Sequence, residues 1–426
     1  MSALERLLGE FDAQPAQSSA RLAAAQALRA HSLPTRREEN WRYANLRALE
    51  SVVRFRPAVP LAPGTGLPPL PAALAGYTRL VFVDGLLSPA WPLPALAPII
   101  RVPVAAALAA DSATLTYETT GDGRMGLIAR MFAPDPLALQ IAGSASLELI
   151  YLTTPGAAGG YTEIVVEIAA DARVSLVERH LGCHLAAAPS AAAAALNCSN
   201  LRLQLGAGAQ LQHTRLQQAA GNALYYDTLT ATLGERASYG LAHIAAGGGS
   251  DRSSALIRLQ GRDASVQIRA LAAARGSEVS DVQFAVLHEA PGTRSDQLFR
   301  GIASDHAHIA CSADVQVLPG APGTRVLQSL RGLIDGKGAA VNLRPRLTIN
   351  TDDIQAAHGA TTGRLDENLL FYLLSRGLEP AAARSLLKWA LLGEAFAAIE
   401  PPALRRAAEV AAAARLSDAP ATELLQ

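Results

Sequence analysis

Hydrophobic residues follow two different periods along this chain, and the changes between them divide it into three parts. At the start the spacing is helical, with four apolar residues on one face: Leu4, Leu7, Leu8 and Phe11. Ser2 and Glu5 stand at the spacing of a capping box, so we predict a helix here. The Ala-rich residues 21–31, which end before Pro34, predict a second helix.

The remainder of the opening third is mixed. Residues 57–71 are rich in proline and predict a linker or an irregular arm. Residues 77–84 (YTRLVFVD) predict a strand that ends at Gly85. We therefore assign residues 1–143 to an N-terminal helical and mixed region with a Pro-rich linker.

Residues 144–350 change to short runs of alternating apolar residues, separated by Gly, Asp and Ala. One motif recurs in them: a turn-like pair, then an alanine, then apolar residues at alternate positions. It begins at Ala172, Ala209, Ala237, Ala264, Ala307 and Ala339. The alternation indicates strands whose side chains point in turn to a core and to solvent.

Many short strands, each led by a small residue at a turn, suit a stacked β-solenoid with loops of unequal length. A β-sandwich or barrel also uses short strands and turn residues, and stays open as the alternative. The recurrence favours the solenoid, so we assign residues 144–350 to a β-solenoid core.

Helical spacing returns in residues 351–426. The first stripe consists of four leucines followed by a glycine stop: Leu369, Leu370, Leu373, Leu374 and Gly377. Pro380 opens a second helix, and a third, Ala-rich helix follows Pro401 and Pro402. We expect these helices to form a compact bundle that serves as a platform for a partner.

The composition of the chain narrows the range of functions that it can have. The 426 residues carry 37 Lys+Arg and 37 Asp+Glu, so the chain lacks the basic footprint of a nucleic-acid or anionic-membrane binder. The first residues are amphipathic and unlike a signal peptide, and no apolar run reaches the length of a membrane span. Three widely spaced cysteines argue against a disulfide framework. We expect a cytoplasmic protein.

Three common enzyme motifs are incomplete or absent in the sequence. Residues 332–337 (GLIDGK) have a glycine spacing one residue short of a phosphate-binding loop, and Gly338 stands where a hydroxyl should bind magnesium. Neither a Gly-x-Ser-x-Gly elbow nor a His-Glu-x-x-His pair occurs. We expect no hydrolysis or nucleotide binding by this chain itself.

Two groups have the residue types of a metal site. In the group His306, His308 and Cys311, strand geometry puts the histidines on one face and the thiol on the other. We interpret them as two surface histidines and a core cysteine. The second group, Cys183, His184 and Cys198, lacks a compact ligand spacing.

His358 lies in what we predict to be a loop between the last strand and the first C-terminal helix. The run that it opens, residues 358–366 (HGATTGRLD), continues into residues 370–378 (LFYLLSRGL). This long, ordered run resembles the C-terminal signature of the SufB/SufD family of iron–sulfur cluster assembly scaffold proteins. Residues 36–43 (RREENWRY) and 80–85 (LVFVDG) resemble segments typical of the SufD branch.

The resemblance implies a mainly β fold, a right-handed parallel β-helix core flanked by α-helical N- and C-terminal regions. It implies a non-catalytic scaffold subunit of the SUF (SufBCD) complex that pairs with SufB and binds the SufC ATPase through its C-terminal helices. An iron–sulfur cluster is then held transiently in the complex, with which a reduced flavin is also associated. No tightly bound cofactor is expected in the isolated chain, which can also pair with itself as a homodimer.

By resemblance, the family's functional histidine maps onto His358, at the SufB interface beside a cysteine of the partner. Many relatives carry Cys-Ser-His-Gly-Ala, whereas this chain has Ala356 and Ala357 before the histidine. A metal site shared with a partner-chain cysteine is therefore expected. Phe371, Tyr372 and Arg376 lie in the helix expected to meet SufC, where the aromatics could equally pack within the bundle.

Two alternatives remain from the sequence. A SufB-like homodimeric scaffold would assemble clusters without a partner, but Ala356 and the N-terminal segment argue against it. A β-helix carbohydrate-active enzyme would place paired carboxylates at matching repeat positions, and the repeats show none.

Overall fold

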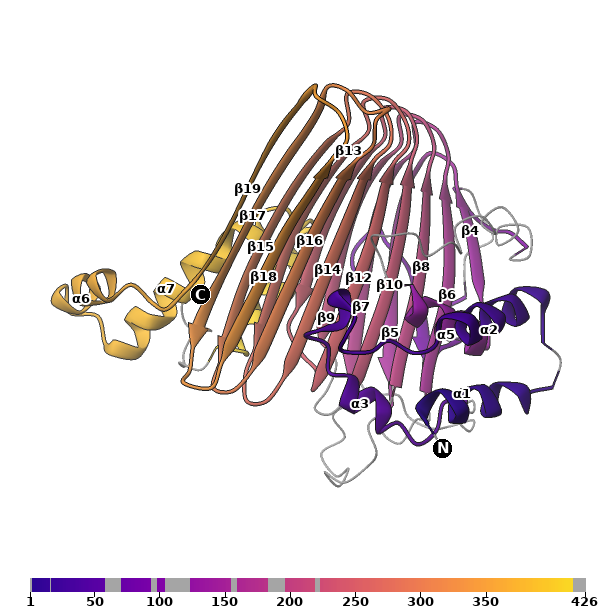
Figure 1. Ribbon diagram of the computed structural model, residues 1–426, viewed down its shortest axis with the longest axis horizontal. Coiled ribbons are helices and arrows are strands. Elements are labelled where there is room, and N and C mark those ends of the chain that lie inside the picture. The colour runs from indigo at the N-terminus through magenta and orange to yellow at the C-terminus, as the bar shows by residue number, and fades with distance from the viewer. Residues whose placement is uncertain are drawn as a thin grey trace.

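Two parallel β-sheets lie face to face and form a solenoid, with helices at both ends of the chain (Figure 1). The structure is a computed structural model, and it describes residues 2–15, 17–57, 70–92, 98–103, 123–154, 159–182, 196–218 and 223–416. The predicted fold class, mainly β with a parallel β-helix core and helical terminal regions, is confirmed. Most of the predicted proline-rich linker, residues 58–69, lies outside the described residues.

From β4 (Leu137–Ile141) onward the described strands alternate between the two sheets. The first sheet has ten strands: β1 (Thr78–Val83), β2 (Leu86–Leu87), β5 (Ser144–Thr153), β7 (Arg173–Gly182), β9 (Gln210–Gln218), β11 (Ser238–Ala245), β13 (Ser265–Ala274), β15 (Arg294–Ser304), β17 (Thr324–Asp335) and β19 (Ile354–Gly363). The second sheet has nine: β3 (Ile99–Arg101), β4 (Leu137–Ile141), β6 (Gly159–Ile168), β8 (Leu196–Leu205), β10 (Leu224–Leu233), β12 (Ser250–Leu259), β14 (Val279–His288), β16 (His308–Val317) and β18 (Ala340–Ile349).

From β4 onward each strand pairs in parallel with the strand two places further along the chain. Strands outside residues 144–350 take part as well, because β1 pairs with β5 in parallel and β19 pairs with β17. Only the short strands β2 and β3 pair antiparallel among the described strands. The sheets therefore begin before residue 144 and end after residue 350.

The recurring alanine has a clear role at the turns. Ala172 and Ala264 are fully or almost fully buried and directly precede strands β7 and β13. The residue before each, Asp171 or Asp263, has a φ near +58° or +59°, and the alanine N–H closes the turn by donating to the carbonyl three residues back. A larger side chain at the alanine would meet the packed interior, which explains why a small residue recurs at this point.

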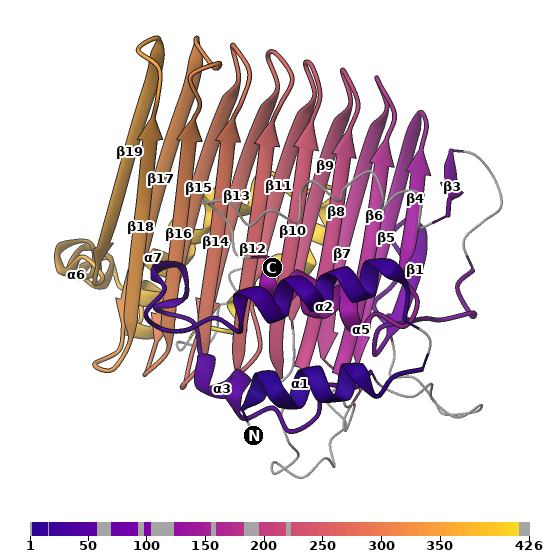
Figure 2. The same ribbon diagram turned by 45° about the vertical axis from the view of Figure 1, so that its right-hand side comes forward.

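The N-terminal helices cover the outer face of the second sheet (Figure 2). They are α1 (Ala3–Asp12), α2 (Ser19–His31), the 3₁₀ turn η1 (Glu39–Trp41), α3 (Leu46–Glu50) and α5 (Arg124–Phe132). The predicted capping box is present in α1, where Ser2 and Glu5 bond each other's backbone. Helix α5 contacts β6, β8 and β10, and α2 packs against α5.

The segment around Trp41 fastens the N-terminal region across this sheet. The Trp41 ring is fully buried, and the Arg252 guanidinium lies 3.8 Å from its centre. Two residues earlier, Glu39 pairs with Arg346 at 2.7 Å and with Arg344 at 3.2 Å, both on β18. The residues that carried the N-terminal resemblance therefore tie the start of the chain to the last strand of the second sheet.

The C-terminal helices are α6 (Glu367–Ser375), α7 (Pro380–Phe396) and α8 (Pro402–Ala413), as the spacing predicts. Helices α6 and α8 both contact α7, but the three helices do not form a bundle separate from the solenoid. Helix α7 packs on β13 and β15 and α8 on β11, because the outer face of the first sheet is itself apolar there, with Ile244, Leu271 and Ile302 buried under the helices. The sheet takes the place of a helical partner.

Charged pairs hold α7 in position. Lys388 is fully buried and pairs with Asp335 at the end of β17, which Arg384 also meets at 2.7 Å. Arg300 on β15 pairs with Glu394 of α7.

Among the described residues, no helix is both long and apolar enough to cross a membrane.

Replacing Trp41 with alanine is expected to destabilise the fold by about 3–5 kcal/mol, the usual cost of deleting a large buried aromatic ring. Urea unfolding of the whole chain measures the loss. Trp91→Ala is the matched control, since the Trp91 ring is only half-buried, and it should cost clearly less. Equal losses in the two variants would show that Trp41 does not anchor the N-terminal segment.

Candidate functional site

The structure places His358 in strand β19, so the prediction of a loop is wrong. His358 stands opposite Gln328 of β17 in a continuous parallel ladder. The sequence pattern did not reveal this strand, because nine of its ten residues are exposed. Exposed positions need not be apolar, so the alternation that marks the other strands is missing here.

His358 continues a row of inward-pointing side chains. In the preceding strands the row holds Gln297 and Gln328, which are buried, and Gln328 donates to the Ala313 carbonyl oxygen at 2.8 Å. One strand further on, His358 is exposed, because the described chain adds no strand beyond β19. The histidine therefore lies at the open end of the solenoid interior.

Strands β18 and β19 end the two sheets, and each has a partner strand on one side only among the described residues. Unpaired backbone N–H and C=O groups along such an edge are a template for another strand. Pro345 in β18 fits an edge position, because proline lacks the N–H that an inner strand needs. The end of the solenoid is thus an unpaired sheet edge in the described part of the chain.

Within the described residues no group of three or more His, Cys, Asp or Glu side chains is arranged to hold a metal ion. His306 and His308 are exposed and Cys311 is buried, which confirms the interpretation as surface histidines and a core thiol. Burial raises the pKa of the Cys311 thiol and keeps it protonated. Cys198 is also buried, while Cys183 and His184 lie outside the described residues.

Helix α6 projects past the end of the solenoid (Figure 1) and carries exposed aromatic side chains. Phe371 is 72% exposed and Tyr372 is 53% exposed, with the Arg376 guanidinium 5.2 Å from the Tyr372 ring centre. Leu369 of the same helix is exposed as well. The alternative that these aromatics pack inside a bundle is therefore excluded for this chain alone, and they are open to a partner.

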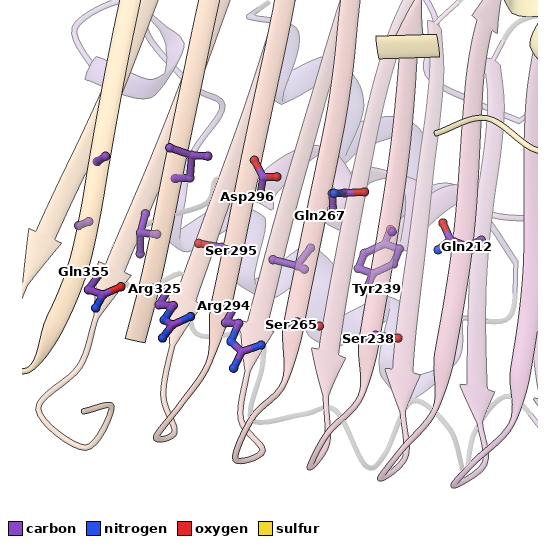
Figure 3. Close-up of a pocket in the computed structure, with 16 residues that line it drawn as sticks. Gln212, Ser238, Tyr239, Ser265, Gln267, Arg294, Ser295, Asp296, Arg325 and Gln355 are labelled. Carbon is purple, nitrogen blue, oxygen red and sulfur yellow. The ribbon is translucent and has the colours of Figure 1, made fainter. Parts of the chain in front are cut away.

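Sequence reasoning did not find a groove that crosses the beginnings of six first-sheet strands, β9, β11, β13, β15, β17 and β19 (Figure 3). Its volume is about 640 Å³, and it ends at Gln355, Ala356 and Ala357, the residues that precede His358 in β19. Arg294 and Arg325 stand side by side along its rim on neighbouring strands. The groove therefore hollows the surface of the first sheet as far as β19, and the His358 side chain is not part of its lining.

Sequence reasoning also missed a charged cluster inside the solenoid, on the first-sheet strands β7, β9 and β11. The Glu178 carboxylate accepts from His213 Nε2 at 2.9 Å and from the Tyr151 hydroxyl at 3.0 Å, and it lies 2.7 Å from Arg215 Nε. Arg215 also pairs with Asp227 of β10, in the opposite sheet. The signal was present in the sequence, since Glu178 takes a place in the alternation where Val174 and Leu176 are apolar.

These contacts fix the protonation of the cluster. Burial would raise the pKa of Glu178, but the Arg215 charge and the His213 hydrogen bond outweigh it and hold that pKa well below its usual value. Since Nε2 of His213 donates to this carboxylate, its Nδ1 accepts from the Tyr239 hydroxyl at 2.9 Å. Burial, and after it the Arg215 charge, lowers the pKa of His243 to about 3. Burial also lowers the pKa of His213, so both histidines are neutral at pH 7.

Comparison with known proteins links the solenoid to a described family. The family model for the SufBD core domain, SUF system FeS cluster assembly, matches residues 151–391. The iron–sulfur cluster assembly protein SufD of Escherichia coli is 26% identical over 394 residues, 88% of this chain and 87% of that protein.

Two further relatives match over shorter stretches. An iron–sulfur cluster assembly SufBD family protein of Synechocystis is 29% identical over 45% of this chain, and one of Mycobacterium tuberculosis is 27% identical over 48%. These matches span 42% and 54% of the two relatives, about half of their lengths.

We predict that His243→Leu weakens the loss of stability in acid. The folded-state pKa near 3 lies below the ordinary value near 6.5, so between these values the unfolded chain binds a proton that the native chain does not. His243 alone should lower the free energy of unfolding of the wild type by about 1.4 kcal/mol per pH unit as the pH falls from 6 to 4.

Urea unfolding at pH 7, 6, 5 and 4 measures the slope. His308→Leu, the same change at an exposed histidine, is the control and should keep the wild-type slope. A constant stability difference between His243→Leu and the wild type at every pH would contradict the assignment.

Proposed function

The chain belongs to the SufBD family of the SUF iron–sulfur cluster assembly system, and from this we propose that it is a non-catalytic scaffold subunit that pairs with SufB and binds the SufC ATPase. The observation that supports it best is the open end of the solenoid, where a free strand edge and His358 lie together. ATP hydrolysis belongs to SufC in this proposal.

Pairing with SufB uses β18 and β19. A partner of the same fold presents the same kind of strand end, so its strands extend both sheets across the joint. The exposed Ile349 at the end of β18 supplies apolar surface for burial there. The isolated chain forms a homodimer through the same edge, which is also the surface that a SufB-like homodimeric scaffold would use.

His358 supplies half of a metal site in this proposal. A neutral imidazole is an iron ligand, but Ala356 and Ala357 beside it carry no donor atoms. A cysteine thiolate of SufB completes the site, and the iron–sulfur cluster is the cargo of the complex. The reduced flavin expected in the complex is assigned to no residue of this chain.

SufC binds α6 in this proposal. The exposed Phe371 and Tyr372 rings form an apolar centre, and Arg376 adds a charge at its border. Aromatic and arginine side chains are the usual anchors of protein interfaces. The site on α6 and the site at His358 lie on the same end of the molecule.

His358→Ala is expected to leave folding and pairing with SufB intact while lowering cluster assembly at least tenfold in the reconstituted complex. Iron and sulfide analysis with absorption spectroscopy measures cluster content, and size-exclusion chromatography measures pairing. His308→Ala, at an exposed histidine of β16, is the control and should assemble as the wild type does. An unchanged cluster yield would remove His358 from the site.

Phe371→Ala should weaken SufC binding about tenfold or more, because truncating a central aromatic anchor commonly costs 1–2 kcal/mol or more. Calorimetric titration of the chain with SufC measures the affinity. Val410→Ala removes an exposed apolar side chain from α8 instead and should bind normally. Equal affinities for the two variants would place the SufC contact elsewhere.

A further inference from the structure

A small cavity lies inside the solenoid next to the charged cluster. Its volume is about 30 Å³, and its lining comes mainly from β1, β5 and β7 of the first sheet and β6, β8 and β10 of the second. Three of the lining residues are His180, Ser199 and Tyr225, which are 4%, 6% and 3% exposed. The cavity is therefore an internal feature of the fold.

Each of these three residues has a buried polar atom without a hydrogen-bond partner: His180 Nε2, the Ser199 hydroxyl and the Tyr225 hydroxyl. The His180 ring cannot turn away, because it is stacked on Tyr151 at 4.3 Å and meets the edge of Tyr225 at 4.7 Å. Its Nε2 lies 3.7 Å from the Glu178 carboxylate, which is too long for a hydrogen bond.

Buried polar atoms in folded proteins almost always have a partner, and three orphans around one cavity call for a shared one. A cavity with about 10–15 Å³ of water-accessible volume is large enough for one water molecule, which usually makes two to four hydrogen bonds in a protein interior. The volume of the cavity and the number of its unpaired atoms both fit that molecule.

We propose that this cavity binds one ordered water molecule, held by His180, Ser199 and Tyr225, as a built-in part of the fold. The water accepts from one hydroxyl and donates to atoms that have a free lone pair, so it bridges the three side chains. Asp84, another lining residue, needs no such bond, because its carboxylate already accepts from the Thr154 N–H at 2.7 Å and from the Thr154 hydroxyl.

Replacing a tyrosine by phenylalanine distinguishes a hydrated cavity from a dry one. If the water is present, Tyr225→Phe removes one of its partners and lowers Tm by about 2 °C. If the cavity is dry, the same change removes an unsatisfied buried hydroxyl and leaves Tm unchanged or raised.

Tyr161→Phe is the matched control. The Tyr161 hydroxyl is also buried and unpaired, but it lies outside the lining of this cavity, so its removal should not lower Tm. Thermal unfolding of the full chain measures both variants. A drop for Tyr225→Phe alone supports the proposal, and the same response in both variants overturns it.

A crystal structure of the chain at about 1.8 Å resolution gives the direct test. We expect one density peak within 3.5 Å of the Ser199 and Tyr225 hydroxyls and of His180 Nε2. The peak should weaken or disappear in Ser199→Ala, which leaves the space open and deletes one partner. An empty cavity in the wild-type crystal would refute the proposal whatever the stability data show.

Discussion

Backbone hydrogen bonds between strands two places apart in the chain, as from β5 to β7 and from β6 to β8, hold this molecule in its shape. They bring each new strand into register with the one before, so identical positions form rows along the solenoid. One such row runs through Gln297 and Gln328 to His358. The site follows from this pairing, because it lies where the row and the ladder stop.

The sequence was most informative where burial imposes a pattern. The alternation in the core and the small residue at Ala172 and Ala264 both reflect a tightly packed interior, and both predicted the solenoid. The capping box of Ser2 and Glu5 depends only on neighbouring residues, so it was readable as well. The family signature then supplied His358 as the residue of interest.

The sequence pattern misled where side chains are exposed, and where contacts between residues far apart in the chain determine the structure. Strand β19 is exposed and was mistaken for a loop, although its ladder with β17 is complete. Helices α7 and α8 contact each other as expected, but they also pack on an apolar face of the first sheet, which the sequence pattern did not predict. Glu178 and Arg215 meet Asp227 only after the chain has wound through successive strands, so no local rule could join them.

The ion pairs beneath α7 have a mechanical consequence. Helix α6 packs against α7, which is locked to the end of β17 through Lys388 and Asp335. Strand β17 in turn is the immediate neighbour of β19. A force on α6 is therefore transmitted through α7 to β17 and its neighbour β19. Strand β19 resists this force least, because it has backbone hydrogen bonds to a neighbouring strand on one side only.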